Sequence, residues 1–455
     1  MNEGDGSRPS RPDAGGTPAV HTTAERLVAL LDHLGIERAH VASNIPGDLA
    51  GMAAAYPDRL GGIVLCAPVR LDPEPFVGVA ERILTVSGEY GPTFDVTARA
   101  SSRLAGAQRF LLDNYEAFGW SDVAADCAGE LGERVIGFLG GFAADAPRAC
   151  VATEGEHAGI SYRIEGNGPA LLLLPFFLAP SQWAPIVPRL AQHFTIVTLG
   201  GRHLGGVAML EDRARAPTYR AMFRTLIDLM APQSGEPILD VGSGAGSLDR
   251  LLARRLGDAN PITGVDANGF LLREAEALAA AEGLADRIRF ELGNAIALPF
   301  PDETFGCVFS VTVIEECDAD KAIAEMVRVA TPGGRIGIIV RAIDLPQWWS
   351  LDLPEPIRRK VTPPPQSVGH GGVADANLYR RMRRAGLTNL TCFPFLVTLD
   401  RPDGPIWRYR EDHVLSLLTG EEREVWQAAR TAAETDGILL GAHAMHCAVG
   451  TKPAA

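Results

Sequence analysis

An apolar run, three alternate glycines and a helical repeat stand one after another in residues 236–256. The segment reads EPILDVGSGAGSLDRLLARRL, in which the apolar run ends at Asp240 and the glycines are Gly242, Gly244 and Gly246. The leucines that follow recur at helical spacing, so the segment predicts a strand, a glycine turn and a helix. Backbone at such a turn touches a ligand only where no Cβ intervenes, and the helix start offers unpaired N–H groups. The turn therefore predicts a pocket for a nucleotide-like ligand.

Length and composition limit the classes of protein to which the chain can belong. Its 455 residues are too many for one ordinary domain and predict two or three. The formal net charge of -14 disfavours a general binder of the phosphate backbone, so no nucleic-acid partner is expected. The 7 cysteines form no C-x-x-C pair and no metal-ligand spacing. They predict buried thiols in a reducing compartment and no metal site.

The chain shows no pattern for secretion or membrane insertion. Residues 1–21 are polar and rich in Gly and Pro, without the apolar core of a signal peptide, and they predict a disordered lead. The longest apolar run, 170–179, is too short to span a bilayer and contains Pro175. We therefore expect a soluble, cytoplasmic protein without a membrane span.

The C-terminal half alternates strands and helices from about Thr218. The predicted strands are PILDV, ITGVD, RFELGN, CVFSVTV and RIGIIV, with helical patterns between them. This order is typical of a doubly wound α/β sheet. Because ligands bind beyond the carboxyl ends of the strands in such a sheet, the residues at those ends are the candidates for a site.

The motif Asp-x-Gly-x-Gly-x-Gly, together with the blocks after it, resembles the signature of class I S-adenosylmethionine-dependent methyltransferases. The dinucleotide-binding pattern needs Gly or Ala at position 247, where this chain has Ser247. The resemblance covers about 218–452. It implies a Rossmann-like methyltransferase domain over 218–455, with S-adenosyl-L-methionine as cofactor. The implied reaction is methyl transfer to a small-molecule acceptor, on oxygen, nitrogen or carbon.

The same resemblance implies roles for individual residues. Asp266, about 20 residues past the glycine turn, would accept both ribose hydroxyls, and the alternative is a helix N-cap. Asn294, followed by Ala295, would meet the adenine amino group, and the alternative is an ordinary turn amide. The rest of the implied cofactor site is Asp240, Gly242, Gly244, Gly246 and Thr312, which ends the fourth strand.

The acceptor side departs from the family pattern. Gly306 stands where relatives often have Asp, and Glu316 where they often have His. An acceptor that is a hydroxyl or an acidic carbon needs a base, and Glu315, Glu316 and His370 are the predicted catalytic candidates. The departures leave open a protein that binds the cofactor without methylating, in a structural or regulatory role.

Residues 341–377 are too long and too rich in Pro and aromatics for a plain connection, so they predict a lid over the acceptor. Trp348 and Trp349 either stack on a planar acceptor or pack the lid onto the core. The four arginines of 379–386 predict a solvated helical face rather than an anion site.

The N-terminal half carries a second strand-to-helix turn. Residues 22–70 predict a helix, a strand, a sharp turn, a helix and a strand, and they resemble the centre of an α/β-hydrolase. In that family G-x-S-x-G places the nucleophilic serine at the apex of the turn. Aligned on Gly47, this chain has Ile45 there, and 83–142 contain no histidine where the triad needs one. The resemblance implies a degenerate domain, with Ser43 as the alternative nucleophile of a true hydrolase.

Residues 159–201 resemble the opening strands and first helix of the same hydrolase fold, yet they follow the part that they should precede. Two arrangements are open: one circularly permuted domain over 22–206, made of the pieces 22–145 and 157–206, or two truncated copies in tandem. We favour permutation because a half-sheet would leave an exposed edge and an uncovered apolar face. Such a domain is expected to shape the acceptor site, bind a partner or mediate homo-oligomerisation.

Overall fold

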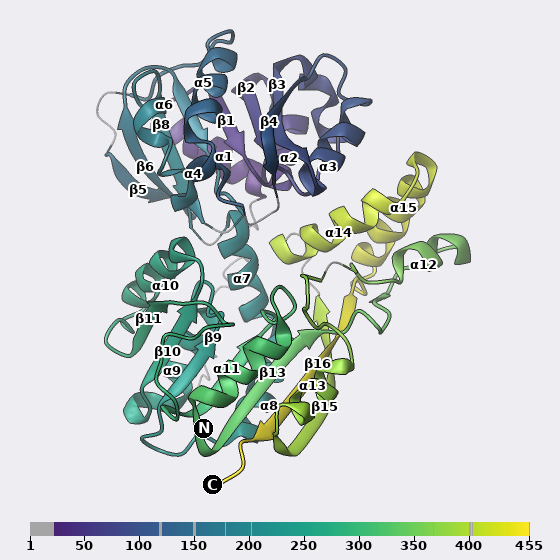
Figure 1. Cartoon of the computed structure of the whole chain (residues 1–455). Helices are drawn as coiled ribbons and strands as arrows, with labels where there is room; N and C mark the ends of the chain where they lie inside the picture. The colour runs from purple at the N-terminus through teal and green to yellow at the C-terminus, as the bar shows by residue number, and fades with distance from the viewer. Residues whose placement is uncertain are drawn as a thin grey trace, which may run out of the picture.

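The chain forms two units, each built on one 8-stranded sheet, with helix α7 (Gly205–Arg215) running between them (Figure 1). This computed structural model describes residues 22–117, 121–148, 152–177, 179–201, 203–366, 368–399, 402 and 404–454. The predicted lead, 1–21, lies outside them. Within the described ranges, no helix is long and apolar enough to cross a membrane.

The sheet of the first unit draws its strands from both N-terminal pieces. Its order is β4-β3-β2-β1-β7-β8-β6-β5, and β1 pairs in parallel with β2 on one side and with β7 on the other. Strands β5 and β6 form an antiparallel edge. The strands are β1 (Ala39–Ser43), β2 (Leu60–Cys66), β3 (Ile83–Tyr90), β4 (Gln108–Glu116), β5 (Glu154–His157), β6 (Ile160–Gly166), β7 (Ala170–Leu173) and β8 (Thr195–Gly200).

Helices cover both faces of this sheet, and β1, β2 and β7 are buried along their whole length, as parallel strands between two layers should be. One apolar cluster packs α1 and α2 against the sheet, and another packs α5, η3 and α6. The helices are α1 (Thr23–Leu34), α2 (Pro46–Ala55), η1 (Pro57–Arg59), η2 (Glu74–Arg82), α3 (Pro92–Ser101), α4 (Val123–Asp126), α5 (Ala128–Leu139), η3 (Pro180–Trp183) and α6 (Val187–Leu190).

The sheet of the second unit has the order β11-β10-β9-β12-β13-β16-β14, and β15 pairs with β16. Strands β9 to β13 run in parallel, and β16 is antiparallel to both β13 and β15. This confirms the predicted doubly wound α/β sheet, which β15 and β16 close with an antiparallel pair. The strands are β9 (Ile238–Val241), β10 (Ile262–Asp266), β11 (Ile288–Leu292), β12 (Phe305–Val311), β13 (Ala330–Arg341), β14 (Trp348–Trp349), β15 (Thr388–Leu399) and β16 (Gly441–Thr451).

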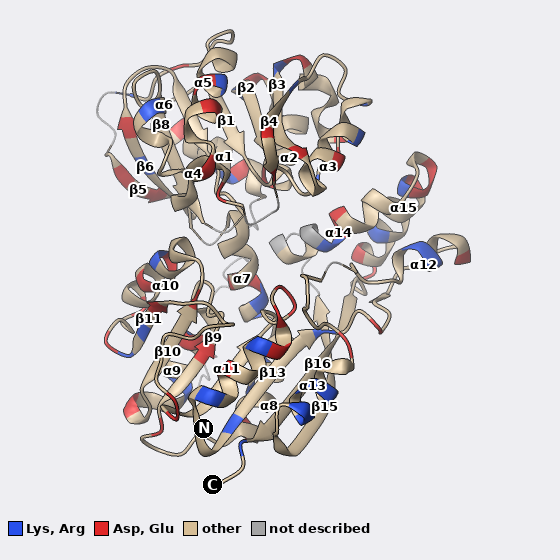
Figure 2. Ribbon diagram, viewed as in Figure 1, with Lys and Arg blue, Asp and Glu red and all other residues tan. Residues whose placement is uncertain are grey.

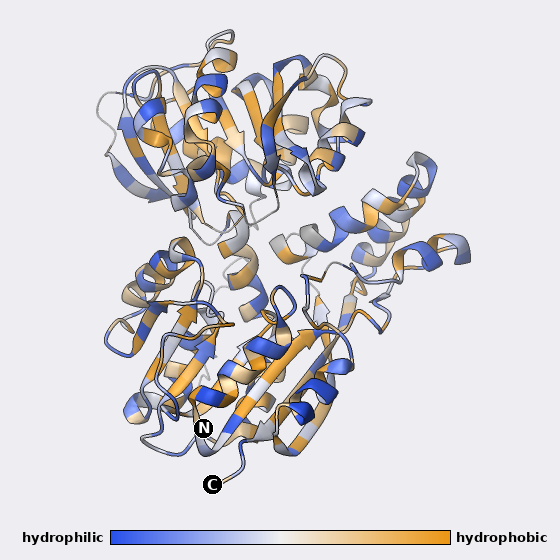
Figure 3. Cartoon of the chain, viewed as in Figure 1, coloured by the Kyte–Doolittle hydropathy of each residue, from blue (hydrophilic) through white to orange (hydrophobic). Residues whose placement is uncertain are grey.

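Helices α8 and α9 cover one face of the second sheet, and α11 and α13 cover the other. The strands of both sheets are mostly apolar (Figure 3), whereas charged residues lie mainly on helices and loops (Figure 2). The helices are α8 (Pro217–Met230), α9 (Ser247–Leu256), η4 (Gly257–Ala259), α10 (Gly269–Ala281), α11 (Ala319–Val329), α12 (Glu355–Val361), α13 (Asn377–Arg384), α14 (Pro405–Leu417) and α15 (Gly420–Thr435).

The segment predicted as a lid packs with α14 and α15 around its own small core. The ring of Trp349 lies 5.5 Å from that of Trp407 and 5.2 Å from that of Trp426, and its Nε1 donates to the carbonyl of Val361. Of the two alternatives for Trp349, packing is therefore what the structure shows. Trp348 is 53% exposed.

The described cysteines are free thiols in three environments. Cys66, Cys307 and Cys447 are buried, and two more are half-buried. The prediction of buried thiols is wrong for Cys392, which is exposed because it lies on β15, a strand paired on one side only. Cys150 lies outside the described residues.

Candidate functional site

The glycine turn follows β9 and leads into α9, and its three glycines all have left-handed backbone: φ is +82° at Gly242, +55° at Gly244 and +70° at Gly246. A Cβ at Gly242 would lie 2.2 Å from a methyl of Val313. A Cβ at Gly246 would lie 2.6 Å from the ring of Phe290. The first and third glycines are therefore required by packing as well as by backbone conformation.

Gly244 differs, because a Cβ there would meet only Leu210 Cδ1, at 3.3 Å. The side of the turn at Gly244 is therefore open, as a ligand cradle must be. The Gly244 N–H donates to Asp266 Oδ2 (2.9 Å), and the Asn268 N–H donates to Asp266 Oδ1 (2.8 Å). Burial raises the pKa of Asp266, and these two N–H groups oppose that rise.

The alternative role of Asp266 as a helix N-cap is wrong. The N-cap of α10 is Asn268, whose side-chain oxygen accepts from the N–H groups of Phe270 and Leu271. Asp266 is instead oriented at the end of β10, beside the glycine turn. Each of its oxygens accepts one N–H and keeps capacity for another donor, so the carboxylate fits the predicted pair of ribose hydroxyls.

Asn294 lies after β11, beyond the next strand end. Its Oδ1 accepts from the Ile296 N–H at 3.1 Å, which is the turn-amide bond of the alternative interpretation, and its side chain is exposed. The contact with an adenine amino group stays a prediction. Ala295 is half-buried against the apolar layer on the α11 side of the sheet.

Asp240 forms a buried carboxyl pair with Asp249, on the first turn of α9. Asp240 is 2% exposed and Asp249 0%. Burial and the neighbouring charge raise the pKa of Asp240 well above its ordinary value, and burial raises the pKa of Asp249 to about 7. We infer from these two shifts that the neighbouring carboxyls hold one proton between them. The pair therefore places about one negative charge under the glycine turn.

This pair makes stability depend on pH, and Asp249→Asn is expected to weaken that dependence. The pKa of Asp249 rises on folding from the ordinary 3.8 to about 7. The folded state thus holds a proton that the unfolded state loses over this interval, so its contribution to stability falls as the pH rises through it. Asparagine cannot ionise and still donates to Asp240.

The measurement is the midpoint of thermal unfolding across that pH interval. The wild type should lose stability more steeply with rising pH than Asp249→Asn. The exposed Asp436, changed to Asn, serves as the matched control and should keep the wild-type slope. Equal slopes for all three proteins would show that the pair does not share a proton.

Thr312, the residue directly after β12, has φ +59°. A β-branched residue in the left-handed region is a real outlier, and such strain gathers at functional sites. The Thr312 N–H donates to the carbonyl of Ile339, and its Oγ1 accepts from Arg213 Nη1 at 3.1 Å. The structure therefore holds Thr312 at the predicted edge, beside an arginine that comes from α7.

Arg213 and Tyr219 are further candidate site residues, which the sequence did not reveal because both precede the glycine motif. The guanidinium of Arg213 lies 4.9 Å from the centre of the Tyr219 ring. The Tyr219 hydroxyl is buried and has no hydrogen-bond partner among the described residues. A cation and an unpaired buried hydroxyl in this place fit the carboxylate and amine of an amino-acid group.

The three candidate bases lie at one edge of the sheet. Both oxygens of Glu315 are taken up by Arg341, through its backbone N–H and its Nε. Glu316 Oε1 lies 3.5 Å from Arg341 Nη2, and its side chain is 43% exposed. Burial raises the pKa of Glu316, against the lowering effect of Arg341. Glu315 is therefore the least available of the carboxylates, and Glu316 is the more accessible.

His370 is exposed on a loop that runs along the residues after β12. The Gly369 N–H donates to the carbonyl of Glu315 at 2.8 Å, and the Ala319 N–H donates to that of Gly371 at 3.1 Å. The fold therefore brings the backbone at His370 next to the two glutamates, as the prediction requires, although its role stays untested.

A further histidine, His443 of β16, lies at the same edge and was not predicted. Burial, together with Arg410, Arg213 and Arg341, lowers the pKa of His443 far below its ordinary value, so the imidazole is neutral. Its sequence context, AHAMHCAV, shows only a strand pattern, which explains why it was missed.

The turn after β1 in the first unit lacks a nucleophile. Ile45, at the predicted apex, has φ -109° and ψ 90°, an ordinary extended conformation, and it precedes Pro46, the first residue of α2. Ser43 Oγ donates to the Ile45 carbonyl at 3.0 Å and accepts from the Ile45 N–H at 3.1 Å. The hydroxyl of Ser43 is thus used within the turn.

Comparison with solved structures gives distant likenesses. The crystal structure of the [4+2]-cyclase SpnF is 20% identical, covers 55% of this chain and 92% of its own, and has a TM-score of 0.35. A geranyl diphosphate methyltransferase in complex with SAM is 19% identical, covers 51% and 84%, and has a TM-score of 0.31. TM-scores this low carry no argument about the present chain.

Two curated relatives match more closely in sequence. The Ubiquinone/menaquinone biosynthesis C-methyltransferase UbiE of Legionella pneumophila (strain Paris) is 34% identical over 117 residues, which are 26% of this chain and 47% of the relative. The protein of that name from Hahella chejuensis (strain KCTC 2396) is 32% identical over 132 residues, 29% of this chain and 53% of the relative. The chain thus spans about half the length of these relatives. Residues 238–334, from β9 into β13, match the family described as Methyltransferase domain.

Proposed function

We propose that this chain is a cytoplasmic, S-adenosylmethionine-dependent methyltransferase that acts on a small-molecule acceptor. The observation that carries the proposal is the open Gly244 beside the oriented carboxylate of Asp266, within the region that matches a methyltransferase domain. Free thiols at all six described cysteines support a reducing compartment.

The residues around the turn fit each part of this cofactor. Asp266 would hold the ribose hydroxyls, Asn294 would lie toward the adenine, and Arg213 with Tyr219 would hold the amino-acid end. When bound, S-adenosylmethionine supplies a methyl group on a positively charged sulfur. The negative charge shared by Asp240 and Asp249 lies under the same turn and favours a cation there.

The chain's own task is then mainly one of positioning. Methyl transfer is an in-line displacement, so the protein must hold donor and acceptor collinear and keep water out. A base is needed where the acceptor is a hydroxyl or an acidic carbon. The curated relatives are named as C-methyltransferases, which supports a carbon acceptor and hence a base. We propose Glu316 for that role ahead of Glu315 and His370.

Calorimetry with S-adenosylmethionine tests the proposal, followed by incubation with candidate acceptors and a search for a product heavier by one methyl group. Asp266→Ala is expected to weaken cofactor binding by about 100-fold to 10,000-fold, because the two hydrogen bonds to this charged acceptor contribute roughly 1.5–3 kcal/mol each. Asp286→Ala, at an exposed turn, is the control and should bind as the wild type does. Failure of the wild type to bind the cofactor would refute the proposal.

For the first unit we propose a circularly permuted, non-hydrolytic α/β-hydrolase-like domain. The strand order supports this: if 152–201 are placed before 22–148, the strands read β5, β6, β7, β8, β1, β2, β3, β4, and the turn at Ile45 follows the fifth of them. Two truncated copies in tandem would not share one sheet in this way.

The chemistry at this turn supports the loss of hydrolysis. Hydrolases of this fold stabilise the oxyanion partly with the N–H of the residue after the nucleophile. Here that residue is Pro46, which has no N–H, and Ile45 has no nucleophilic atom. The turn thus lacks both the attacking group and one half of an oxyanion hole.

A further inference from the structure

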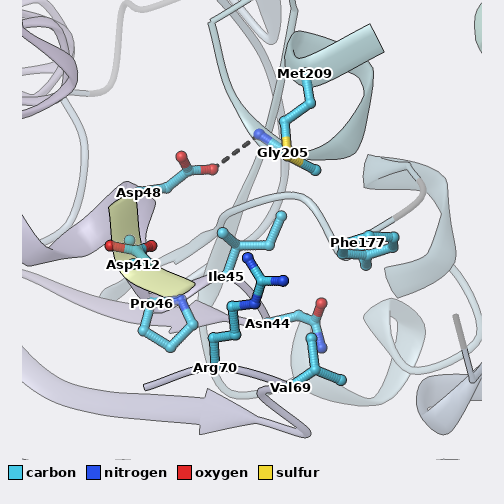
Figure 4. A pocket seen from close by; sticks show the side chains of 11 residues that line it. Asn44, Ile45, Pro46, Asp48, Val69, Arg70, Phe177, Gly205, Met209 and Asp412 are labelled. Atoms are coloured by element: carbon cyan, nitrogen blue, oxygen red, sulfur yellow. Dashed lines mark hydrogen bonds between the residues drawn. The ribbon is translucent and has the colours of Figure 1, made fainter. Parts of the chain in front are cut away.

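A pocket of about 50 Å3 opens at the turn after β1 (Figure 4). It lies beyond the carboxyl ends of the neighbouring strands β1 and β7. From β1 the chain continues to β2 on one side of the sheet, and from β7 it continues to β8 on the other side, so the direction of strand addition reverses between β1 and β7. In open α/β sheets this switch point is where ligands bind. We call it the elbow pocket; its lining is Asn44, Ile45, Pro46, Gly47, Asp48, Val69, Arg70, Phe177, Gly205, Met209 and Asp412.

The elbow pocket has a mainly apolar wall and one unsatisfied acceptor. Asn44 is 3% exposed, and its Nδ2 donates to the carbonyls of Cys66 at 2.9 Å and Ala67 at 2.8 Å. These two bonds fix the orientation of the amide. Its Oδ1 is buried and has no hydrogen-bond partner among the described residues. A buried acceptor of this kind is satisfied by a water or by a donor from a bound molecule, and the apolar wall of the pocket favours the second.

The size of the pocket limits what that molecule can be. A single water needs roughly 10–15 Å3 of cavity volume of this kind, so the pocket of about 50 Å3 admits about four water-sized groups, which is a molecule of a few heavy atoms. Val69, Phe177 and Met209 line it with apolar surface. The matching ligand is a short alcohol or amide, or the end of a longer molecule that carries a hydroxyl or N–H next to an apolar chain.

Helix α7 joins this pocket to the glycine turn of the second unit. Its first residue, Gly205, donates its N–H to Asp48 Oδ2 at 2.8 Å, and Met209 faces the pocket (Figure 4). One residue later, Leu210 lies against Gly244. Further along, Arg213 bonds to Thr312. One short helix therefore touches both sites.

A buried ion pair holds α7 onto the second unit. Arg250 of α9 donates to Glu211, and their side chains are 3% and 8% exposed. Arg250 also donates to the carbonyl of Ala245, within the glycine turn, at 2.7 Å. A shift of α7 at the pocket would therefore be transmitted to the backbone that forms the cradle.

We propose that the elbow pocket is a non-hydrolytic binding site for a small, largely apolar molecule with a hydroxyl or N–H donor, and that its occupancy changes cofactor affinity through α7. The binding part stands on the pocket alone. The coupling part rests on the proposed function, because it needs the cofactor to bind at Gly244.

The first experiment uses the full chain and ligand-observed NMR with 1-butanol, isobutyramide and diethyl ether. The alcohol and the amide should bind, whereas the ether should not, because it offers Asn44 Oδ1 no donor. Val69→Phe fills the pocket without altering the turn and should weaken binding at least about fivefold, a loss of roughly 1 kcal/mol. Val77→Phe, at a 48% exposed position outside the pocket, should bind as the wild type does.

Equal binding of all three probes, or binding that Val69→Phe does not reduce, would overturn the proposed site and leave water as its occupant. An unfolding midpoint close to that of the wild type shows that Val69→Phe is folded. A second variant, Met209→Phe, fills the pocket from α7 and should also weaken probe binding.

Coupling is measured by titrating S-adenosylmethionine with and without saturating isobutyramide. Its affinity should change about fivefold or more, the usual range for linked sites, and Val69→Phe should abolish the change. Probe binding with unchanged cofactor affinity overturns the coupling but not the pocket. Probe binding in a protein that binds no cofactor refutes the proposed function and leaves the pocket standing.

Discussion

Gly244→Val is expected to weaken binding of S-adenosylmethionine by about 100-fold or more while the chain stays folded. A Cβ at this position meets only the flexible end of Leu210, so we expect packing to tolerate the substitution. It would fill the open side of the turn, where backbone N–H groups have to approach the cofactor. Calorimetry gives the affinity, and thermal unfolding gives the cost of the left-handed backbone.

Two other glycines make the result specific. Gly283 has φ +70° with nothing near its Cβ, so Gly283→Val carries a similar backbone strain, about 1–2 kcal/mol, away from the site. It should lose stability and keep full cofactor affinity. Gly242→Val would press on Val313 and should unfold the domain. Cofactor binding by Gly244→Val at wild-type strength would place the ligand elsewhere.

The fold of the second unit was predictable because its signals are local. The strand before Asp240, the left-handed glycines and the helix after them all lie within one short segment. The position of Asp266 followed from the length of one strand-helix-strand repeat. The structure differs from the prediction only in the helix cap. Asn268, two residues after Asp266, is the N-cap of α10, so the carboxylate of Asp266 stays at the glycine turn.

Other site residues were hidden because they meet the turn only in three dimensions. Arg213 precedes the motif and reaches Thr312 through the path of α7, and Tyr219, on α8, places its ring against Arg213. In the sequence, Asp249 is one polar residue of an amphipathic helix, and only the structure shows that it is buried next to Asp240. His443 was also hidden from the sequence, because it comes near the site only through the pairing of β16 with β13.

The role of the predicted lid, residues 341–377, could not be decided from the sequence either. Its two tryptophans were open between acceptor contact and packing, since neither spacing nor composition identifies their neighbours. In the folded chain, α14 and α15 supply Trp407 and Trp426 around Trp349. Those helices lie far along the sequence, so only the tertiary structure could decide.

The choice among the three candidate bases also needed the structure. All three reach one edge of the sheet, but Arg341 occupies both oxygens of Glu315 and lies 3.5 Å from one oxygen of Glu316. The raised pKa of Glu316 brings its carboxylate closer to the proton affinity that a base needs near neutral pH. We propose Glu315 as a positioning residue, which holds Arg341 beside Glu316.

Glu316→Gln is therefore expected to lower kcat by about 100-fold to 10,000-fold with little change in cofactor affinity, as the loss of a general base does. The wild-type rate should rise with pH through an inflection above the ordinary carboxyl value of 4.5, because only the ionised form accepts the proton, and the variant should lack this rise. Glu315→Gln should move the inflection to lower pH, since it removes a neighbouring negative charge that raises the pKa of Glu316, and His370→Ala should leave it in place. Wild-type rates in all three variants would show that the acceptor needs no base.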